Sequence, residues 1–128
     1  MTSTFDSRMV GDVHVLVPAR NLVGGEETRA LANAVAQLAT GSSAKVVMDL
    51  RRISWVSSLG IEGLRRIHRT CEEHSGWLRL AGAGQRIENI ILTMRLDWVF
   101  DTFDTVEEAV VTPRHETRQP RLRPKSAH

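Results

Sequence analysis

The stretch VVMDLRRISWVSSLGIEGL, Val46–Leu64, contains the change of hydrophobic pattern that decides the fold. It begins inside a short apolar run over residues 44–50, whose adjacent valines are typical of a central strand covered on both faces. Over residues 59–73 the apolar residues recur at helical spacing, which predicts an amphipathic helix. Two serines, Ser57 and Ser58, stand between these segments, where the strand must give way to the helix.

Strand-like and helix-like segments alternate on both sides of this stretch. Upstream, alternating valines predict a strand over residues 12–18 after a weaker candidate over 3–9, and apolar residues at helical spacing predict a helix that begins near Glu26. This alternation indicates an α/β domain with a small central mixed sheet that is largely parallel in the middle. The downstream elements are predicted as a strand over 76–82, a helix over 87–94, a short strand over 98–103, and a helix over 105–111 that begins with a capping box of Thr105 and Glu108.

The composition is that of an ordinary cytoplasmic protein. A length of 128 residues predicts one domain, and 41% hydrophobic with 25% charged residues is typical of a soluble globular chain. The single cysteine, Cys71, cannot form an intrachain disulfide, which favours a reducing compartment. The N-terminal residues show no basic patch leading into an apolar run, so we expect no signal peptide, and no window reaches the roughly 18 apolar residues of a membrane span.

The basic character of the chain is concentrated at its C-terminal end. Residues 113–128 hold five arginines or lysines against one glutamate, and because the whole chain carries +2, residues 1–112 carry −2. The same segment holds three of the four prolines, so we expect a disordered basic tail that follows a folded domain over residues 1–112. The tail could touch nucleic acid or anionic lipid, but a solubilising terminus is the simpler interpretation, and we expect no direct, specific nucleic-acid binding.

Two fragments of enzyme motifs occur, and both are incomplete. GAGQRI, Gly82–Ile87, supplies the first two glycines of a dinucleotide fingerprint, but Ile87 stands where the third should be, so we interpret it as a strand-to-helix turn. SLG, Ser58–Gly60, is half of a nucleophile elbow, but Val56 replaces the first glycine of that motif and no histidine is placed to activate the serine. We therefore predict that the protein has no catalytic residues and is not an enzyme.

No cofactor or metal site is expected either. His68, Cys71 and His74 are spaced by three along the predicted helix, but structural zinc usually takes four ligands and Cys71 is in phase with the apolar stripe. The tryptophans are scattered rather than interleaved with basic residues, so we interpret them as packing residues and not as a stacking platform for nucleic acid. Trp77 and Arg79 are expected to share an outward face of their strand.

The two serines allow two interpretations. Serine is a preferred N-cap, because its oxygen accepts from the free N–H groups of the first helical turn, and Ser58 is placed to be that cap. A helix N-terminus also stabilises a phosphate, through the same N–H groups and the helix dipole. A phosphoserine there would add a charge of about −1.5 to −2 to the surface. These patterns alone do not choose between a cap and a phosphate acceptor.

The order of the segments resembles a known family, the STAS domains of bacterial anti-sigma factor antagonists. The resemblance covers residues 5–112, where RNLVGGEETRAL is similar to the family's earlier strand-to-helix segment and residues 78–110 are similar to its closing half. Two positions depart from the family's Asp-Ser-Ser-Gly-Leu-Gly pattern, because Ser57 replaces the aspartate and Leu59 replaces the second serine. The matching positions are Asp49-Leu50, Trp55-Val56, Ser58 and Gly60-Ile61.

The resemblance implies a small α/β domain whose central sheet is covered by helices mainly on one side. It also implies a regulatory binding protein, whose unphosphorylated form binds an anti-sigma factor that is also a serine kinase. In the family, this kinase phosphorylates the first serine of the motif and breaks the complex, and a phosphatase restores it. Carried over, the phosphate acceptor is Ser58, with Ser57 as the alternative. The expected partner-binding residues are Asn21, Gly24, Gly25, Ser57, Ser58, Leu59, Gly60, Ile61 and Glu62.

A second function within the same resemblance is that of an interaction subunit without the phospho-switch. The loss of the aspartate beside the acceptor and the apolar Leu59 favour such a constitutive protein contact. Examples are a stress-signalling scaffold and an accessory subunit of a lipid-transport complex. In either case we expect protein partners, no cofactor, and a monomer or weak dimer.

Overall fold

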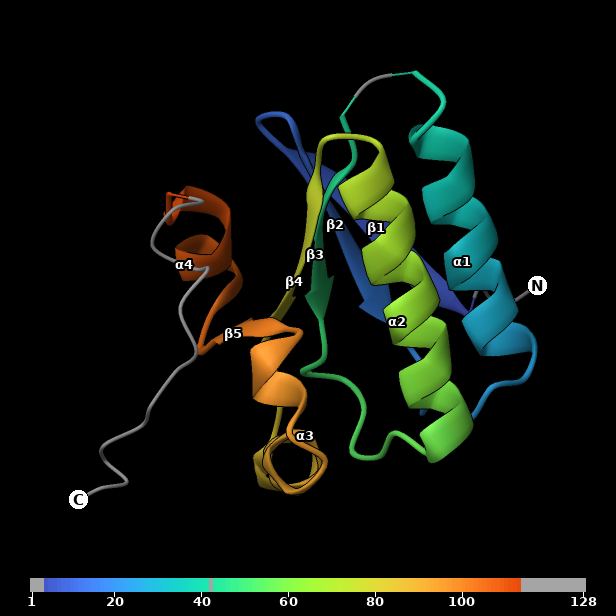
Figure 1. Cartoon of the computed structure of the whole chain (residues 1–128), viewed down its shortest axis with the longest axis vertical. Coiled ribbons are helices and arrows are strands. Elements are labelled where there is room, and N and C mark those ends of the chain that lie inside the picture. Colours follow the sequence, from blue (N-terminus) through green and yellow to red (C-terminus); the bar gives the residue numbers. More distant parts are fainter. Residues whose placement is uncertain (1–3, 42, 114–128) are drawn as a thin grey trace.

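The computed structural model of the chain, which describes residues 4–41 and 43–113, is built around a five-stranded sheet (Figure 1). Its strands are β1 (Phe5–Val10), β2 (Val13–Pro18), β3 (Lys45–Asp49), β4 (Trp77–Ala81) and β5 (Asp101–Phe103). They lie in the order β1-β2-β3-β4-β5, so strands that follow one another in sequence are neighbours in the sheet. The first pair is antiparallel and the later pairs are parallel, which confirms the predicted mixed sheet with a parallel middle.

The helices lie mainly on one side of this sheet, as predicted. They are α1 (Glu26–Leu38), α2 (Ser58–Glu73), α3 (Gln85–Thr93) and α4 (Val106–Val111), with a short 3-10 helix, η1 (Leu96–Trp98), before β5. In Figure 1, α1 and α2 lie side by side over one face of the sheet, whereas α4 lies on the opposite face.

The two faces of the sheet belong to two apolar clusters. Leu16, Met48 and Leu80 are aligned across β2, β3 and β4, and they join the larger cluster with the helices α1 and α2. Val15 and Val47 point the other way and join the smaller cluster, under α4. Every residue of β3 after its first is buried, which is the environment that its continuous apolar run predicts.

The C-terminal elements differ from their predicted form in two details. The strand predicted over 98–103 is shorter, because residues 96–98 form η1 and the buried side chain of Phe100 leads the chain into β5. Thr105 does cap α4, accepting from the N–H of Glu108 at 3.1 Å. The carboxylate of Glu108 accepts from the N–H of Asp104 at 3.3 Å, one residue before the position that a capping box requires.

Trp77 and Arg79 share a face of β4, but the expectation that this face points outward is wrong. Arg79 is only 1% exposed, and its guanidinium carbon lies 3.8 Å from the centre of the Trp77 ring. Its Nη1 donates to the carbonyl of Ala109 in α4 at 2.6 Å. The short last helix covers this side of the sheet, which the alternation within β4 alone cannot reveal.

Two predictions fall on residues that lie outside the described part of the chain. One is residue 3, the first of the predicted strand over 3–9. The other is the basic tail over 113–128, of which only Pro113 is described, so the domain boundary near residue 112 stays a prediction.

Candidate functional site

The serine that caps α2 is Ser57, not Ser58. Ser57 has an extended backbone (φ −84°, ψ 175°), and its Oγ accepts from the N–H of Gly60 at 3.2 Å. The N–H of Ser57 donates to the carbonyl of Leu22 at 2.9 Å, which keeps this residue in the extended strand-like path. The helix therefore begins at Ser58, one residue earlier than it would if Ser58 were the cap. Ser58 is the first residue of α2 and its side chain is exposed.

The loop before α1 and the loop before α2 form one unit, although they lie 33 residues apart in sequence. The side-chain oxygen of Asn21 accepts from the N–H groups of Ser54 at 3.0 Å and Trp55 at 3.2 Å. Beside it, Leu22 and Val56 form an isolated parallel β-bridge. Asn21, which the sequence placed in the partner-binding set, therefore also positions the loop that leads to Ser58.

A buried carboxylate holds the turn between β2 and α1. Glu27 accepts from the N–H groups of Val23 at 2.7 Å and Gly25 at 3.1 Å, and from the hydroxyl of Thr28 at 2.9 Å. Thr28 in turn accepts from the N–H of Gly24 at 3.0 Å. Burial acts to raise the pKa of Glu27, but these hydrogen bonds outweigh it and lower the pKa to about 2. The ionised carboxylate of Glu27 thus stabilises the turn. Its position in the first helical turn predicted only a favourable interaction with the helix dipole.

Glycines allow this turn to lie directly against α2. A methyl group on Gly60 would collide with the carbonyl of Leu22, and one on Gly24 would collide with the Cβ of Leu59. Gly24 also has φ +84°, a conformation that favours glycine. Of the predicted partner-binding residues, Gly24 therefore packs against Leu59, and Gly60 packs against Leu22 of the other loop.

The turn after β3 is fixed by the aspartate of the Asp49-Leu50 pair. Asp49 is fully buried, and its carboxylate accepts from the backbone N–H of Arg51 at 3.1 Å and from the guanidinium of the same residue at 2.9 Å. These hydrogen bonds fix the backbone of the turn from which the loop toward Ser57 begins. Both flanks of the loop are thus anchored, by Asp49 at its beginning and by Asn21 near its end.

Exposed and mostly apolar side chains lie at the start of α2 and on the two loops before α1 and α2. Leu59 is 64% exposed, Val23 45% and Trp55 39%, and the exposed Ser58 and Glu62 lie among them. We call these five residues the Ser58 surface. Of the predicted partner-binding residues, Ser58, Leu59 and Glu62 belong to this surface. Ile61 does not, because it is buried in the core, and Gly60 is buried against the neighbouring loop.

A groove that the sequence did not predict adjoins this surface. It has a volume of about 330 Å³ and lies between the loop before α2 and one side of α3. The guanidinium carbon of Arg86 lies 5.2 Å from the centre of the Trp55 ring, next to the groove. The sequence signal for its second wall is the set of positions 86, 89, 90 and 93, which share one stripe of α3. We call this groove the Ser58 groove. It is lined by Trp55, Val56, Ser57, Ser58, Asn89, Ile90, Thr93 and Met94.

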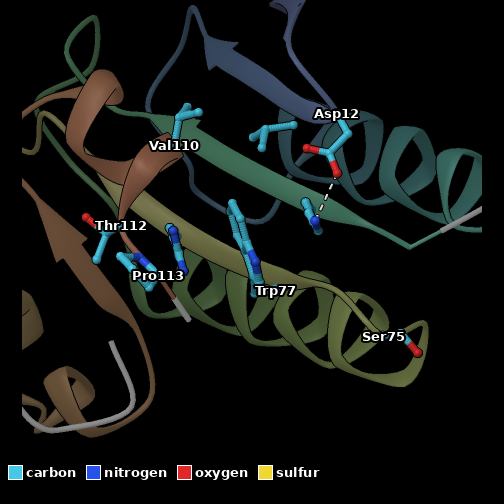
Figure 2. Close-up of a pocket in the computed structure, with 9 residues that line it drawn as sticks. Asp12, Ser75, Trp77, Val110, Thr112 and Pro113 are labelled. Carbon is cyan, nitrogen blue, oxygen red and sulfur yellow. Dashed lines mark hydrogen bonds and ion pairs between the residues drawn. The ribbon is translucent and has the colours of Figure 1, made fainter. Parts of the chain in front are cut away.

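A second cavity, of about 320 Å³, lies on the opposite face of the sheet beside α4 (Figure 2). Lys45 and Asp12 form an ion pair of 2.8 Å at its edge, and the hydrogen bond from Lys45 lowers the pKa of Asp12. Trp77 and the buried Arg79 form part of its wall. The cavity is far from the Ser58 surface in the fold, since the sheet separates the two.

The predicted histidine and cysteine residues of α2 behave as packing and boundary residues. Cys71 is fully buried, and burial raises the pKa of its thiol to about 12. His68 packs edge-on against Phe100 with ring centres 5.8 Å apart, and His74 contacts the carbonyl of Thr70 at 2.9 Å. Over residues 4–41 and 43–113, no group of three or more potential ligands could hold a metal ion.

The model of the STAS domain family matches residues 10–109, which is most of the chain. The chain belongs to the STAS domain family. The strand order, the mixed sheet and the helix that begins after Ser57 are therefore features of a STAS domain. Among curated protein sequences, none matches the chain.

Several solved structures share the fold of this STAS domain. A candidate anti-sigma factor antagonist from Thermotoga maritima has 21% identity and a TM-score of 0.74, over 90% of this chain and 95% of that one. The anti-sigma factor antagonist SpoIIAA in its unphosphorylated form has 15% identity and a TM-score of 0.65, over 84% and 94% of the two chains. The murine anion transporter Solute Carrier 26 family member A9 has 16% identity and a TM-score of 0.64, over 81% of this chain but 18% of the transporter. At these identities the likeness shows the fold alone.

The helices of this STAS domain give no indication of a membrane span. In the part of the chain that the structure describes, none of them combines the length and the apolar character needed to cross a bilayer. The α2 helix, of 16 residues, is the longest, and it presents charged side chains to solvent on one side.

Proposed function

We propose that this STAS domain is an anti-sigma factor antagonist that binds an anti-sigma factor with serine kinase activity and is switched off by phosphorylation of Ser58. The observation that carries the proposal is the position of Ser58, exposed as the first residue of a 16-residue helix, next to the exposed Leu59 and lining the same groove as Trp55. A kinase can reach this hydroxyl without unfolding the helix, because Ser57 does the capping. A phosphatase would restore the binding form.

The electrostatics of α2 support a phosphate at this position. Its first turn contains no acidic residue, so the helix dipole and the free N–H groups there favour an added negative charge. A phosphate would add about −1.5 to −2 charges beside Leu59, which is 64% exposed. The domain would therefore stay folded while its apolar contact surface becomes charged.

The replacement of the family's aspartate by Ser57 is compatible with this switch. Aspartate and serine are both preferred N-cap residues, so the exchange removes a charge and leaves the helix start unchanged. The Oγ of Ser57 is engaged by the N–H of Gly60 and the residue is half-buried, whereas Ser58 is exposed. Ser58 is thus the better acceptor of the two.

The second candidate function is an interaction subunit without the switch, such as a stress-signalling scaffold or a lipid-transport accessory subunit. The observation that favours it is the exposed Leu59, which gives a permanently apolar contact where the family pattern has a serine. Under this function Ser58 would be part of the contact surface but would carry no phosphate.

Further expectations accompany the proposal. The protein acts in the cytoplasm as a monomer or weak dimer, has no catalytic activity of its own, and does not bind nucleic acid specifically. Its folded domain ends near residue 112, and residues 113–128 serve as a solubilising tail. Deleting residues 113–128 should then leave the affinity for the kinase unchanged.

Phosphate mapping separates the two functions. The purified protein is incubated with ATP and with serine kinases of the anti-sigma factor type from the same organism, and phosphate is located by mass spectrometry. We expect phosphate on Ser58, its loss in Ser58→Ala, and its retention in Ser57→Ala. Phosphate that persists in Ser58→Ala would refute the acceptor assignment, and no phosphate with any such kinase would favour the interaction subunit.

A further inference from the structure

The Ser58 groove presents apolar side chains that no part of residues 4–41 and 43–113 covers. Trp55 is 39% exposed on the side of the loop, and Met94 is 45% exposed at the end of α3. Ile90 and Val56 form the floor between them, the first half-buried and the second buried. Ser58 and Trp55 line the groove and also belong to the Ser58 surface, so a partner that contacts these two residues lies next to the groove.

A positive charge lies beside the Trp55 wall of the groove. None of the eight lining residues is acidic or basic, and the guanidinium carbon of Arg86 lies 5.2 Å from the centre of the Trp55 ring. Arg86 is exposed, and its position over the Trp55 ring directs it toward the groove while its charge is still accessible. A basic segment would be repelled here, whereas an acidic one would be attracted.

We propose that the Ser58 groove holds an apolar side chain of the partner protein and that Arg86 pairs with a carboxylate next to that side chain. The identification of this partner as the anti-sigma factor kinase rests on the proposed function, but the chemistry of the groove does not. In protein interfaces a few residues in well-packed pockets contribute most of the binding energy, and tryptophan and arginine are enriched among them.

This arrangement gives phosphorylation a second effect. A phosphate on Ser58 would stand at the edge of the same groove, where it attracts Arg86 and repels the partner's carboxylate. The switch would then act on the partner through charge competition at Arg86 as well as through the charged Ser58 surface.

Two short peptides test the groove without knowledge of the kinase. The acidic probe is acetyl-Leu-Leu-Glu-Glu-amide and the basic probe is acetyl-Leu-Leu-Lys-Lys-amide, each titrated into the full chain at low salt and followed by NMR. We expect the acidic probe to shift the indole N–H of Trp55 and the methyl of Met94, with an affinity roughly two- to fivefold higher than that of the basic probe, as for one exposed ion pair. Arg86→Glu should reverse this preference.

Matched variants and the remaining outcomes decide the inference. Arg69→Glu, which makes the same charge change on an exposed position near the other end of α2, should leave the preference for the acidic probe intact. Equal shifts with both probes, or shifts confined to the cavity beside α4, would overturn the proposal. It would also fail if the free protein is a dimer that Arg86→Glu dissociates, since the occupant would then be a second copy. A missing phosphate on Ser58 would refute the switch but not the groove.

Discussion

At the scale of single residues, two adjacent serines have different roles because one lies just outside α2 and the other just inside it. Ser57 has an extended backbone and uses its oxygen for the N–H of Gly60. Ser58 has helical geometry and directs its side chain to the surface. The sequence predicted a cap and a phosphate acceptor at this place but assigned both to Ser58. A one-residue shift of the helix start separates them.

Stability measurements on single variants test this division. Ser57→Ala removes the cap and should lower the free energy of unfolding by about 0.5–2 kcal/mol. Ser58→Ala removes an exposed hydroxyl and should change that free energy by no more than about 0.5 kcal/mol. Urea unfolding followed by circular dichroism measures both. A larger loss in Ser58→Ala than in Ser57→Ala would contradict the assignment of the cap.

Glu27 gives the fold a pH dependence of known sign. Its pKa is lowered from 4.5 to about 2 in the folded protein, so its stabilising effect is complete above about pH 4.5 and is lost as the pH falls toward 2. The loss should approach about 3 kcal/mol at most. Urea unfolding of the wild type and of Glu27→Gln, at several pH values between 7 and 2.5, measures it. The wild type should lose its advantage over the variant on acidification, and a constant difference would contradict this role.

At the scale of elements, the site depends on how closely the loop before α1 approaches α2. Gly60 and Gly24 leave room for the Leu22 carbonyl and for Leu59, and Asn21 fixes the loop that precedes Ser57. The sequence placed these residues together only through the family resemblance. Spacing alone could not reveal the contact, because it joins segments on either side of α1 and β3.

A glycine substitution tests this approach. Gly60→Ala places a methyl group against the backbone of Leu22, which cannot move without breaking its hydrogen bond to Ser57, so we expect a loss of about 2 kcal/mol or more in the free energy of unfolding. Gly41→Ala is the matched control, because nothing lies near the added methyl group there. Thermal unfolding of the two variants should therefore differ, and similar midpoints would show that the helix start is not closely packed.

At the scale of the whole molecule, the fold followed from sequence more fully than the site did. The alternation of strand and helix patterns predicted the mixed sheet, and the continuous apolar run predicted the burial of β3. The prediction that the Arg79 face of β4 points outward was wrong. The helix α4 that covers this face is short, and its packing over Arg79 depends on contacts distant in sequence. The groove was missed for the same reason, since its two walls come from the loop before α2 and from α3.

The single thiol reports on the integrity of the whole domain. Cys71 lies on the buried face of α2, and its pKa is raised to about 12, so the native protein should hold it as an unreactive thiol at pH 8. Reaction with an excess of a colorimetric disulfide reagent should therefore proceed only as fast as the domain opens, and should become immediate in 8 M urea. Rapid stoichiometric reaction of the native protein would show that the core is more open than the structure.

If phosphorylation of Ser58 releases the partner, a negative charge at this position should weaken binding. Calorimetric titration of the cognate anti-sigma factor kinase with the wild type, Ser58→Asp and Ser57→Asp compares a charge at the acceptor with a charge at the cap. We expect Ser58→Asp to weaken binding tenfold or more, a change of about 1.4 kcal/mol, and Ser57→Asp, which restores the family's aspartate, to have a smaller effect. Equal affinity of the wild type and Ser58→Asp would contradict this expectation.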